Sequence, residues 1–349
     1  MATRTLDSGK TLKSATARFR AARDRGVAWL LDHIASDGRP VGADTQNGWG
    51  RVPWALAVSG ESAAGHAVLA WAEREALDGS GHFRAGPYGG GDRFGSYPLS
   101  HFAIGAWLLE RYDVALKCMG AIRALQDSST GGVPVDPPGG QWAHRHDLLS
   151  TAQAGVAALF SGQEDIIDGV HRWIVDLVGQ QPDFPGRFHT ARDGAELLVE
   201  PEPDFVWLSI TDFTQPRQSY YTTGMAAVFL AGYAMRRGDT AALALGHRLL
   251  SANIGGTSAQ FDDLESVQAC KFAWGAAAMQ TADPEADYRD HLLRMGDWFI
   301  ARQSPDGAWT PSRFATPQPG DVHKLIKTAE HVMEINAVIA ALGHLAGRG

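Results

Sequence analysis

Titratable and hydrogen-bonding side chains recur at similar places along this chain, one or two helical turns before segments rich in alanine and glycine. Burying a polar group without a partner costs about 1 to 3 kcal/mol, so a segment used only for packing would carry alanine or leucine there. We therefore expect these side chains to converge on one site. In chain order they are Trp49, Arg51, Tyr97, His101, His144, His146, Asp147, Tyr220, Tyr221, Asp262, Glu265, Gln268, Glu330, His331 and Glu334.

Four of these residues carry groups suited to proton transfer or to the stabilisation of developing charge. We predict that His101 and His331 form the proton-transfer pair. Asp147 is predicted to orient or acidify the site, and Tyr220 to donate a hydrogen bond to a developing oxyanion or hydroxyl. Arg51 is a candidate to bind a carboxylate or phosphate on the substrate. The other predicted substrate contacts are Trp49, Tyr97, His144, His146, Tyr221, Asp262, Gln268 and Glu334, with Phe188 and Trp207 from an insertion described below.

A purely structural interpretation exists for each of the main candidates. Asp147 precedes an apolar run and is typical of a helix N-cap. His101 is followed by Phe102 and Ile104 and is compatible with a satisfied core histidine. His331 lies between Glu330 and Glu334, which are close enough on a helix to hold it by ordinary side-chain contacts. The tyrosines at 220 and 221 are compatible with packing at a helix start. Both interpretations stay open at this stage.

The elements that position these residues follow a repeat of two helices. Paired apolar stretches of helical length, such as 222–233 followed by 240–251, are separated by glycine-rich turns. The first helix of each pair is rich in small residues, which allows close packing in an inner ring, and the second alternates apolar and charged residues, as expected of an outer layer. The turns are Ser36-Asp37-Gly38, Asp78-Gly79-Ser80-Gly81, Ser129-Thr130-Gly131-Gly132, Pro185-Gly186, Asn253-Ile254-Gly255-Gly256 and Pro305-Asp306-Gly307.

The order of the pairs predicts a closed ring. The opening helix, about 19–33, has no inner partner, and the last inner helix, about 329–345, has no outer one. Pairing these two helices would close an all-α (α/α)6 barrel. We expect a flexible N-terminus at 1–13 and a single barrel domain over 14–349, because no linker or low-complexity run interrupts the pairs.

One insertion, at about 180–219, departs from the repeat. It contains strand-like runs at 187–191, 196–199 and 205–210, and Asp193-Gly194 between two of them predicts a hairpin. A long insertion in a compact domain is commonly functional. We predict a lid over the barrel mouth, with Phe188, His189, Phe205 and Trp207 roofing the site.

Composition excludes several functional classes. The formal net charge is -8 and the pI is near 5.9, and no clustered basic surface that would bind nucleic acid is visible. No apolar run reaches the length of a membrane span, and residues 1–13 lack the apolar core of a signal peptide, so we expect a cytoplasmic protein. The glycine-rich stretch 86–95 lacks the strand and the Gly-Lys-Ser/Thr of a phosphate loop and is predicted to be a second rim loop. No nucleotide or metal cofactor is implied, and the oligomeric state is left open.

The segment Gln303-Ser304-Pro305-Asp306-Gly307-Ala308-Trp309 resembles the glutamine-tryptophan repeat of squalene-hopene cyclase and its relatives. Weaker copies lie at 126–133 and 181–188. The whole chain resembles a single α-α toroid domain of the terpenoid cyclase and protein prenyltransferase superfamily. The aspartate-rich D-x-D-D acid motif of class II cyclases is absent, and Asp262-Asp263-Leu264-Glu265 matches neither it nor the metal-diphosphate motif of class I enzymes. Cys270 and His331 stand where the resemblance implies zinc ligands of a prenyltransferase, but Gln268 occupies the aspartate position and is a poor zinc ligand, so we predict no metal.

Three functions fit these observations. The first is a cofactor-free cyclase or isomerase of a largely apolar terpenoid- or polyketide-like intermediate, with aromatic walls that stabilise developing positive charge. The second is a carbohydrate-active enzyme, because (α/α)6 barrels also resemble glycoside hydrolases, polysaccharide lyases and sugar epimerases, and tryptophans and carboxylates suit sugars. The third is a barrel that captures a hydrophobic ligand without turnover. In each case we expect a small-molecule partner.

Overall fold

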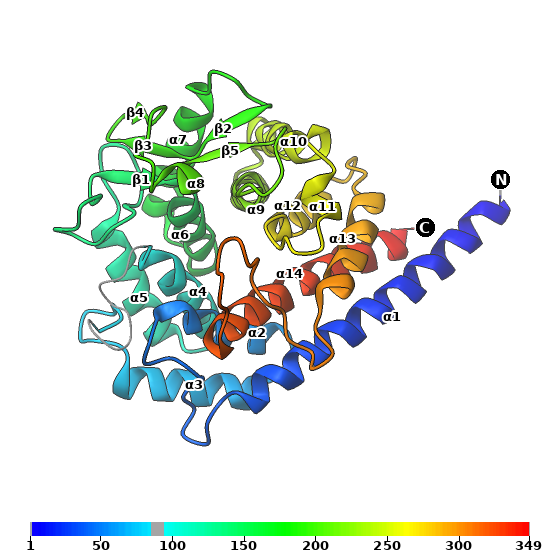
Figure 1. Ribbon diagram of the computed structural model, residues 1–349, viewed down its shortest axis with the longest axis horizontal. Helices are drawn as coiled ribbons and strands as arrows, with labels where there is room; N and C mark the ends of the chain where they lie inside the picture. The colour runs from blue at the N-terminus through cyan, green and yellow to red at the C-terminus, as the bar shows by residue number, and fades with distance from the viewer. Residues whose placement is uncertain (1, 85–93, 349) are drawn as a thin grey trace.

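The computed structural model describes residues 2–84 and 94–348, which form a ring of paired helices (Figure 1). The inner helices contact one another in chain order, and the last of them contacts the first, so the described part of the chain closes the predicted (α/α)6 barrel. The inner helices are α2 (Val52–Val58), α4 (Ser96–Leu108), α6 (Leu148–Ser161), α9 (Tyr221–Arg237), α12 (Cys270–Ala282) and α14 (Asp321–Arg348).

The outer helices each pack behind an inner one. They are α1 (Ala2–Asp32), α3 (Ser62–Glu75), α5 (Tyr112–Leu125), α7 (Glu164–Gly179), α10 (Thr240–Gly255) and α13 (Arg289–Arg302). The pairing of α1 with α14, predicted from the two helices that lacked partners, is confirmed (Figure 1). Helix α1 also covers residues 2–13, for which we expected a flexible terminus. In the described residues, no helix is long and apolar enough to cross a membrane.

Four of the predicted turns have the same conformation, and glycine is required in each. Gly38, Gly81, Gly131 and Gly307 have φ between 84° and 94°, where a Cβ is disfavoured. A Cβ at any of them would also lie within 2.5 Å of a backbone oxygen of an outer helix, for example 2.1 Å from the carbonyl oxygen of Gly169 in the case of Gly131. The turns therefore rest directly on the backbone of the neighbouring outer helix.

The glutamines of the repeat hold these turns in place. The Gln303 side-chain amide donates to the carbonyl oxygens of Ala22 and Gly307, at 2.7 and 2.9 Å, and so ties α1 to the last turn. Gln126 donates in the same way to Gly131 and to Ile166 of α7. The glutamine-tryptophan resemblance thus reflects a structural contact between adjacent repeats.

The insertion forms short antiparallel strands. These are β2 (Arg187–His189), β3 (Ala191–Asp193), β4 (Glu196–Leu197) and β5 (Ile210–Asp212), and β1 (Arg145–Asp147), which precedes α6, pairs with β3, so that the sheets are β1-β3-β4 and β2-β5. The predicted hairpin at Asp193-Gly194 is confirmed, since it joins β3 to β4. Residues 205–210, predicted as a strand, instead hold the short helix α8 (Val206–Ser209) before β5 begins.

The sheets lie over the α6 and α7 side of the ring, whereas the long connection between α13 and α14 reaches toward its middle (Figure 1). Ser312 of this connection is buried, and its hydroxyl accepts a hydrogen bond of 2.8 Å from the backbone N–H of Val267, just before α12. The insertion is therefore a side cover for the ring, and the α13–α14 connection lies nearer the starts of α12 and α14. Most of the predicted glycine-rich rim loop, 86–95, lies outside the described residues.

Candidate functional site

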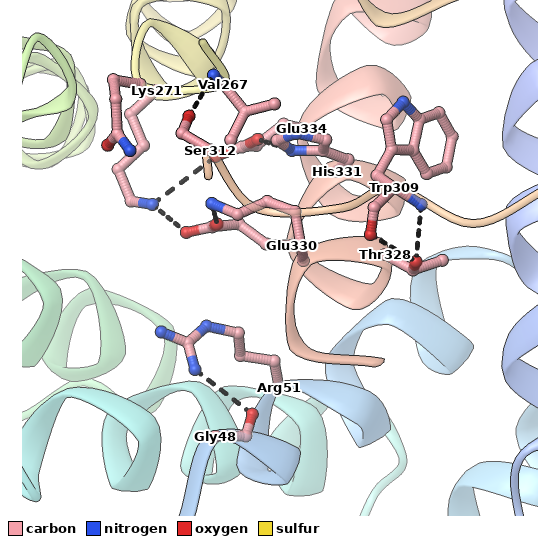
Figure 2. Close-up of polar contacts among 12 residues, drawn as sticks. Gly48, Arg51, Val267, Lys271, Trp309, Ser312, Thr328, Glu330, His331 and Glu334 are labelled. Carbon is pink, nitrogen blue, oxygen red and sulfur yellow. Dashed lines mark hydrogen bonds and ion pairs between the residues drawn. The ribbon is translucent and has the colours of Figure 1, made fainter. Parts of the chain in front are cut away.

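A cluster of buried charges lies at the start of α12 and in the first half of α14 (Figure 2). The Lys271 ammonium is hydrogen-bonded to Glu330 and lies 3.6 Å from the Glu334 carboxylate. Lys327, one turn before Glu330 on α14, donates to the same carboxylate at 2.5 Å. The side chains of Lys271, Glu330 and Glu334 are 4, 6 and 2 % exposed, so the charges compensate one another almost out of contact with water.

Glycines at the helix contact set the position of Lys271. A Cβ on Gly224 of α9 would lie 2.2 Å from the carbonyl oxygen of Lys271, and a Cβ on Gly275 would lie 2.8 Å from the carbonyl oxygen of Gly224. Helices α9 and α12 can approach this closely only because both positions lack side chains. The small-residue pattern of the inner helices thus brings the start of α12 into the ring.

Arg51 and Tyr97 border the cluster from the opposite side. The Tyr97 hydroxyl donates to Glu330 at 3.3 Å, and the Arg51 guanidinium lies 4.7 Å from the centre of the Tyr97 ring. Arg51 ends the short 3-10 helix η1 (Asn47–Arg51), where its Nη1 donates to the Gly48 carbonyl at 3.2 Å. The guanidinium faces the Lys271–Glu330 pair across the site (Figure 2). The predicted convergence of residues 51, 97, 330 and 334 is therefore observed.

The electrostatics of the cluster favour full ionisation of the Lys271–Glu330 pair. Burial disfavours the charged form of Glu330, but Lys271 and Lys327 outweigh it and hold the pKa of this carboxyl well below its usual range. Burial likewise opposes the charge of Lys271, yet Glu330 and its neighbours raise the pKa of this ammonium well above the ordinary lysine value. Lys271 is thus a fixed cation rather than a neutral amine near pH 7.

His101 lies one turn after Tyr97 on α4 and is 1 % exposed. Its Nδ1 is 2.8 Å from the Tyr97 carbonyl oxygen, which only accepts, so Nδ1 carries the proton and Nε2 is the basic nitrogen. Burial, together with the nearby Arg51 charge, lowers the pKa of His101 well below its usual value. Its Nε2 has no hydrogen-bond partner among the described residues. The imidazole is a neutral base next to the charged cluster.

Aromatic side chains lie beside His101 on the inner helices. Trp54 of α2 has its ring centre 5.4 Å from that of His101 and 5.4 Å from that of Trp274 on α12. Phe160, near the end of α6, contacts the same Trp54 ring at 6.0 Å. We call Trp54, Phe160 and Trp274 the aromatic floor. Trp54 and Trp274 lie in the first two turns of α2 and α12, whereas Phe160 lies near the end of α6 and is 38 % exposed.

His331 lies on the other side of Glu330. Its Nδ1 is 3.0 Å from the Glu334 carboxylate, and the rings of Trp298, Phe299 and Trp309 surround it at centre distances of 5.1 to 5.8 Å. Burial lowers the pKa of His331 even though Glu334 opposes the change. His331 therefore makes the structural contact with Glu334 that the sequence suggested, and it also lies next to the charged cluster.

Asp147 is the N-cap of α6. Its carboxylate accepts hydrogen bonds from the backbone N–H groups of Leu149, at 2.8 Å, and Ser150. The structural interpretation of this residue is confirmed. Burial raises the pKa of Asp147 to about 6, although hydrogen bonds from Ser150 and Leu149 lower it in part.

Several predicted residues do not join the cluster. The Tyr220 hydroxyl donates to the Gln215 carbonyl within the chain, so this group is engaged and is not directed at a substrate oxyanion. Trp49 packs against Trp71, Phe83 and Phe102 between the helix layers. Their positions in the sequence predicted that Tyr220 and Trp49 would line the site. In the structure, the rotation of each helix about its axis points both side chains away from the charged cluster.

The charged residues before α6 and α12 also differ from the prediction. His144 is exposed and lies 3.5 Å from Asp193, whereas His146 is buried between Thr130 and Asp127. Asp262 is exposed and pairs with Arg294 of α13 at 3.0 Å. Extended backbone precedes α6, and α11 (Ala259–Asp262) ends before α12 begins, so helical spacing does not apply to these positions.

The residues of the insertion that we expected to cover the site lie elsewhere, and the remaining predicted positions differ in burial. Phe188 packs on Phe184, and Phe205 packs on Trp142 beneath the strands, so neither forms a roof over the charged cluster. Trp207 is partly exposed and lines a surface hollow with Arg187 and Asp212. Three further predicted residues lie before or at the starts of α9 and α12. Tyr221 is half-buried, with its ring 5.7 Å from the Lys271 ammonium. Gln268 is buried, and Glu265 is exposed.

Sequence reasoning missed Lys271 and Lys327. Each lies three residues from a selected position, Lys271 after Gln268 and Lys327 before Glu330, but lysine is rarely buried, and their partners lie on another helix or one turn away. The usable signal was the pair of glutamates at 330 and 334 on an inner helix, because two buried carboxylates require cationic partners.

No family model and no curated protein matches this sequence. Many solved structures share the fold at low identity. A GH76 α-mannanase of Bacteroides thetaiotaomicron is 10 % identical, with a TM-score of 0.64 over 95 % of this chain and 97 % of that one. The type II terpene cyclase MstE of Scytonema, in complex with geranylgeranyl dihydroxybenzoate, is 11 % identical, with a TM-score of 0.60 over 94 % and 99 %. A protein from Actinoplanes is 16 % identical, with a TM-score of 0.58 over 92 % and 99 %.

These similarities establish the α/α toroid fold for this chain. Enzymes of two different classes, a terpene cyclase and glycoside hydrolases, are among the proteins that share it. The fold alone therefore does not decide what this chain does, and its function has to be argued from the site.

The site brings together potential metal ligands, which can be tested against the zinc ligands implied by the prenyltransferase resemblance. Ligand atoms of Cys270, Glu330, His331 and Glu334 all lie within 4.8 Å of one another. However, ammonium groups already neutralise Glu330, Lys271 lies 3.6 Å from Glu334, and burial raises the pKa of the Cys270 thiol far above its usual value. Zinc prefers deprotonated thiolate, so this donor set fits the lysine cations better than a metal.

Proposed function

We propose that the protein is a cofactor-independent cyclase or isomerase of a largely apolar, terpenoid- or polyketide-like intermediate. The observation that carries this proposal is His101, a buried neutral imidazole whose basic Nε2 has no partner among the described residues. It lies between the aromatic floor and the ionised Lys271–Glu330 pair. A base in this position suits proton abstraction from an apolar substrate in a dry site.

The neighbouring groups supply the other requirements of such a reaction. Nε2 of His101 would accept a proton from a carbon or hydroxyl of the substrate. The Lys271 ammonium, which has protons beyond the one that it donates to Glu330, would stabilise charge developing on a nearby oxygen. The faces of Trp54 and Trp274 stabilise a developing carbocation, each by about 0.5 to 2 kcal/mol. His331, paired with Glu334, remains the proposed second member of the proton-transfer pair.

A carbohydrate-active enzyme is the second candidate, and one observation favours it. Glu330 and Glu334 are two carboxylates with oxygens within 4.8 Å of each other, slightly closer than the about 5 to 5.5 Å of a retaining glycosidase, and GH76 enzymes share the fold. The lysines that neutralise both glutamates count against it, because a glycosidase acid must hold a proton and its partner must be free to attack.

Untargeted mass spectrometry tests the proposal. The purified protein is incubated with an extract of prenylated and polyketide metabolites, and products are separated by retention time and mass. A cyclase or isomerase gives products of unchanged mass and new retention time, whereas a hydrolase adds the mass of water. His101→Gln is expected to reduce the mass-neutral conversion at least a hundredfold, while His66→Gln, an exposed histidine on α3, leaves it unchanged. Full turnover in folded His101→Gln would refute the assignment.

A further inference from the structure

Within this cluster the cations outnumber the carboxylates, while the buried Asp147 carboxylate lies outside it as the N-cap of α6. Arg51, Lys271 and Lys327 are three cationic side chains, and Glu330 and Glu334 are the two carboxylates that border them. The histidines on either side are held neutral by burial. Because an uncompensated charge is costly away from water, a buried cation of this cluster that has no carboxylate partner calls for a negative charge from a ligand.

The excess charge is located at Arg51. Both lysines contact Glu330, whereas Arg51 makes no ion pair with any described residue. Its contacts are one backbone carbonyl, that of Gly48, and the face of Tyr97. Its Nε is buried without a partner among the described residues, and the whole side chain is 9 % exposed. A guanidinium in such a place lacks a full set of hydrogen-bond acceptors. A carboxylate is the acceptor whose geometry best matches that of a guanidinium.

We propose that the substrate is an amphiphilic monocarboxylate whose carboxylate binds Arg51 at the start of the inner helices and whose apolar part lies against the aromatic floor. One guanidinium without an ion-pair partner favours a singly charged carboxylate over a doubly charged phosphate. The apolar part follows from Trp54, close to Arg51 in sequence, whose ring contacts those of Trp274 and Phe160. This assignment rests on the proposed function, since it names the substrate class of the same site.

Binding of three alkyl probes tests the head group directly. Isothermal titration at pH 7.5 compares dodecanoate, dodecanol and dodecyl phosphate with the whole protein. We expect dodecanoate to bind at least tenfold more tightly than dodecanol. Arg51→Met should remove this difference by weakening dodecanoate binding at least tenfold, with dodecanol unchanged. Arg51→Lys, which keeps the charge but loses the fork of donors, should retain part of the preference.

The controls separate this inference from the proposed function. Lys324→Met removes a half-buried lysine of α14 that pairs with Asp321, and it should leave all three affinities unchanged. His101→Gln should bind dodecanoate normally even though it loses turnover. If Arg51→Met does not fold, Arg51→Lys still has to show a reduced preference. Equal binding of dodecanoate and dodecanol, an unchanged preference in both Arg51 variants, tighter binding of dodecyl phosphate, or no saturable dodecanoate binding would each overturn the proposal.

Discussion

At the scale of single residues, Lys271 is the side chain on which most of the cluster depends. Its ammonium contacts Glu330 and lies near Glu334, and both Tyr97 and Tyr221 present their rings to it at 5.6 and 5.7 Å. Removal of one partner from a buried pair leaves the other charge without compensation, which costs far more than the net contribution of the intact pair.

We therefore expect Lys271→Met to lower the free energy of unfolding by about 3 to 5 kcal/mol. In the double variant Lys271→Met/Glu330→Gln the loss should be smaller than in the single variant, because the orphaned carboxylate is gone. Denaturant unfolding monitored by circular dichroism measures both values. Lys117→Met, on the outer helix α5 and exposed, is the matched control and should change stability by less than about 0.5 kcal/mol. A double variant less stable than Lys271→Met would contradict this account.

At the scale of elements, close backbone contact between inner helices positions the site. Helices α9 and α12 meet at Gly224 and Gly275, and the carbonyl of Lys271 occupies the space that a side chain at 224 would need. The cap of α6 by Asp147 and the turns that rest on Gly38, Gly131 and Gly307 fix the other helix starts in the same way. The close backbone contacts between the repeats therefore determine where the polar groups lie.

Two glycine-to-alanine substitutions in helices distinguish packing from helix propensity. Gly224→Ala places a Cβ 2.2 Å from the Lys271 carbonyl and should destabilise the protein by about 2 to 4 kcal/mol. Gly120→Ala, in α5, meets no atom within 4 Å and should stabilise it by about 0.5 to 1 kcal/mol. Thermal unfolding of both variants checks the prediction. Similar melting temperatures for the two variants would show that the close approach of α9 and α12 is not needed.

At the scale of the whole molecule, burial of neutral histidines makes the stability of the ring depend on pH. His101 and His331 have folded-state pKa values below that of an unfolded histidine, near 6.5. The unfolded chain then binds more protons in acid, so this stabilising contribution is complete above pH 6.5 and is lost as the pH falls toward the folded-state values. Asp147, whose folded-state pKa is raised to about 6, acts in the opposite direction.

We expect the free energy of unfolding to fall by at least about 1 kcal/mol between pH 7.5 and pH 5.5, because the unfolded chain takes up protons on both histidines in this range and the buried imidazoles do not, which outweighs the opposite effect of Asp147. Urea titrations at the two pH values measure the difference. His101→Phe should reduce the pH dependence, whereas His66→Gln on the surface should not. Identical pH dependence in the wild type and His101→Phe would show that His101 is not held neutral by the fold.

The sequence by itself determined the ring and the end at which the site lies. Helix periodicity, small residues and glycine turns depend on contacts between neighbours in the chain, so the pairing of α1 with α14 and the convergence of Arg51, Tyr97 and Glu330 were predictable. Tertiary structure alone decided which polar side chains turn inward. The rotation of each helix start depends on backbone contacts across the ring, such as that between Gly224 and Lys271, and these bring together residues nearly 50 positions apart or more. For this reason Lys271 and Lys327 were missed, and Trp49, His144 and Asp262 were placed in a site that they do not join.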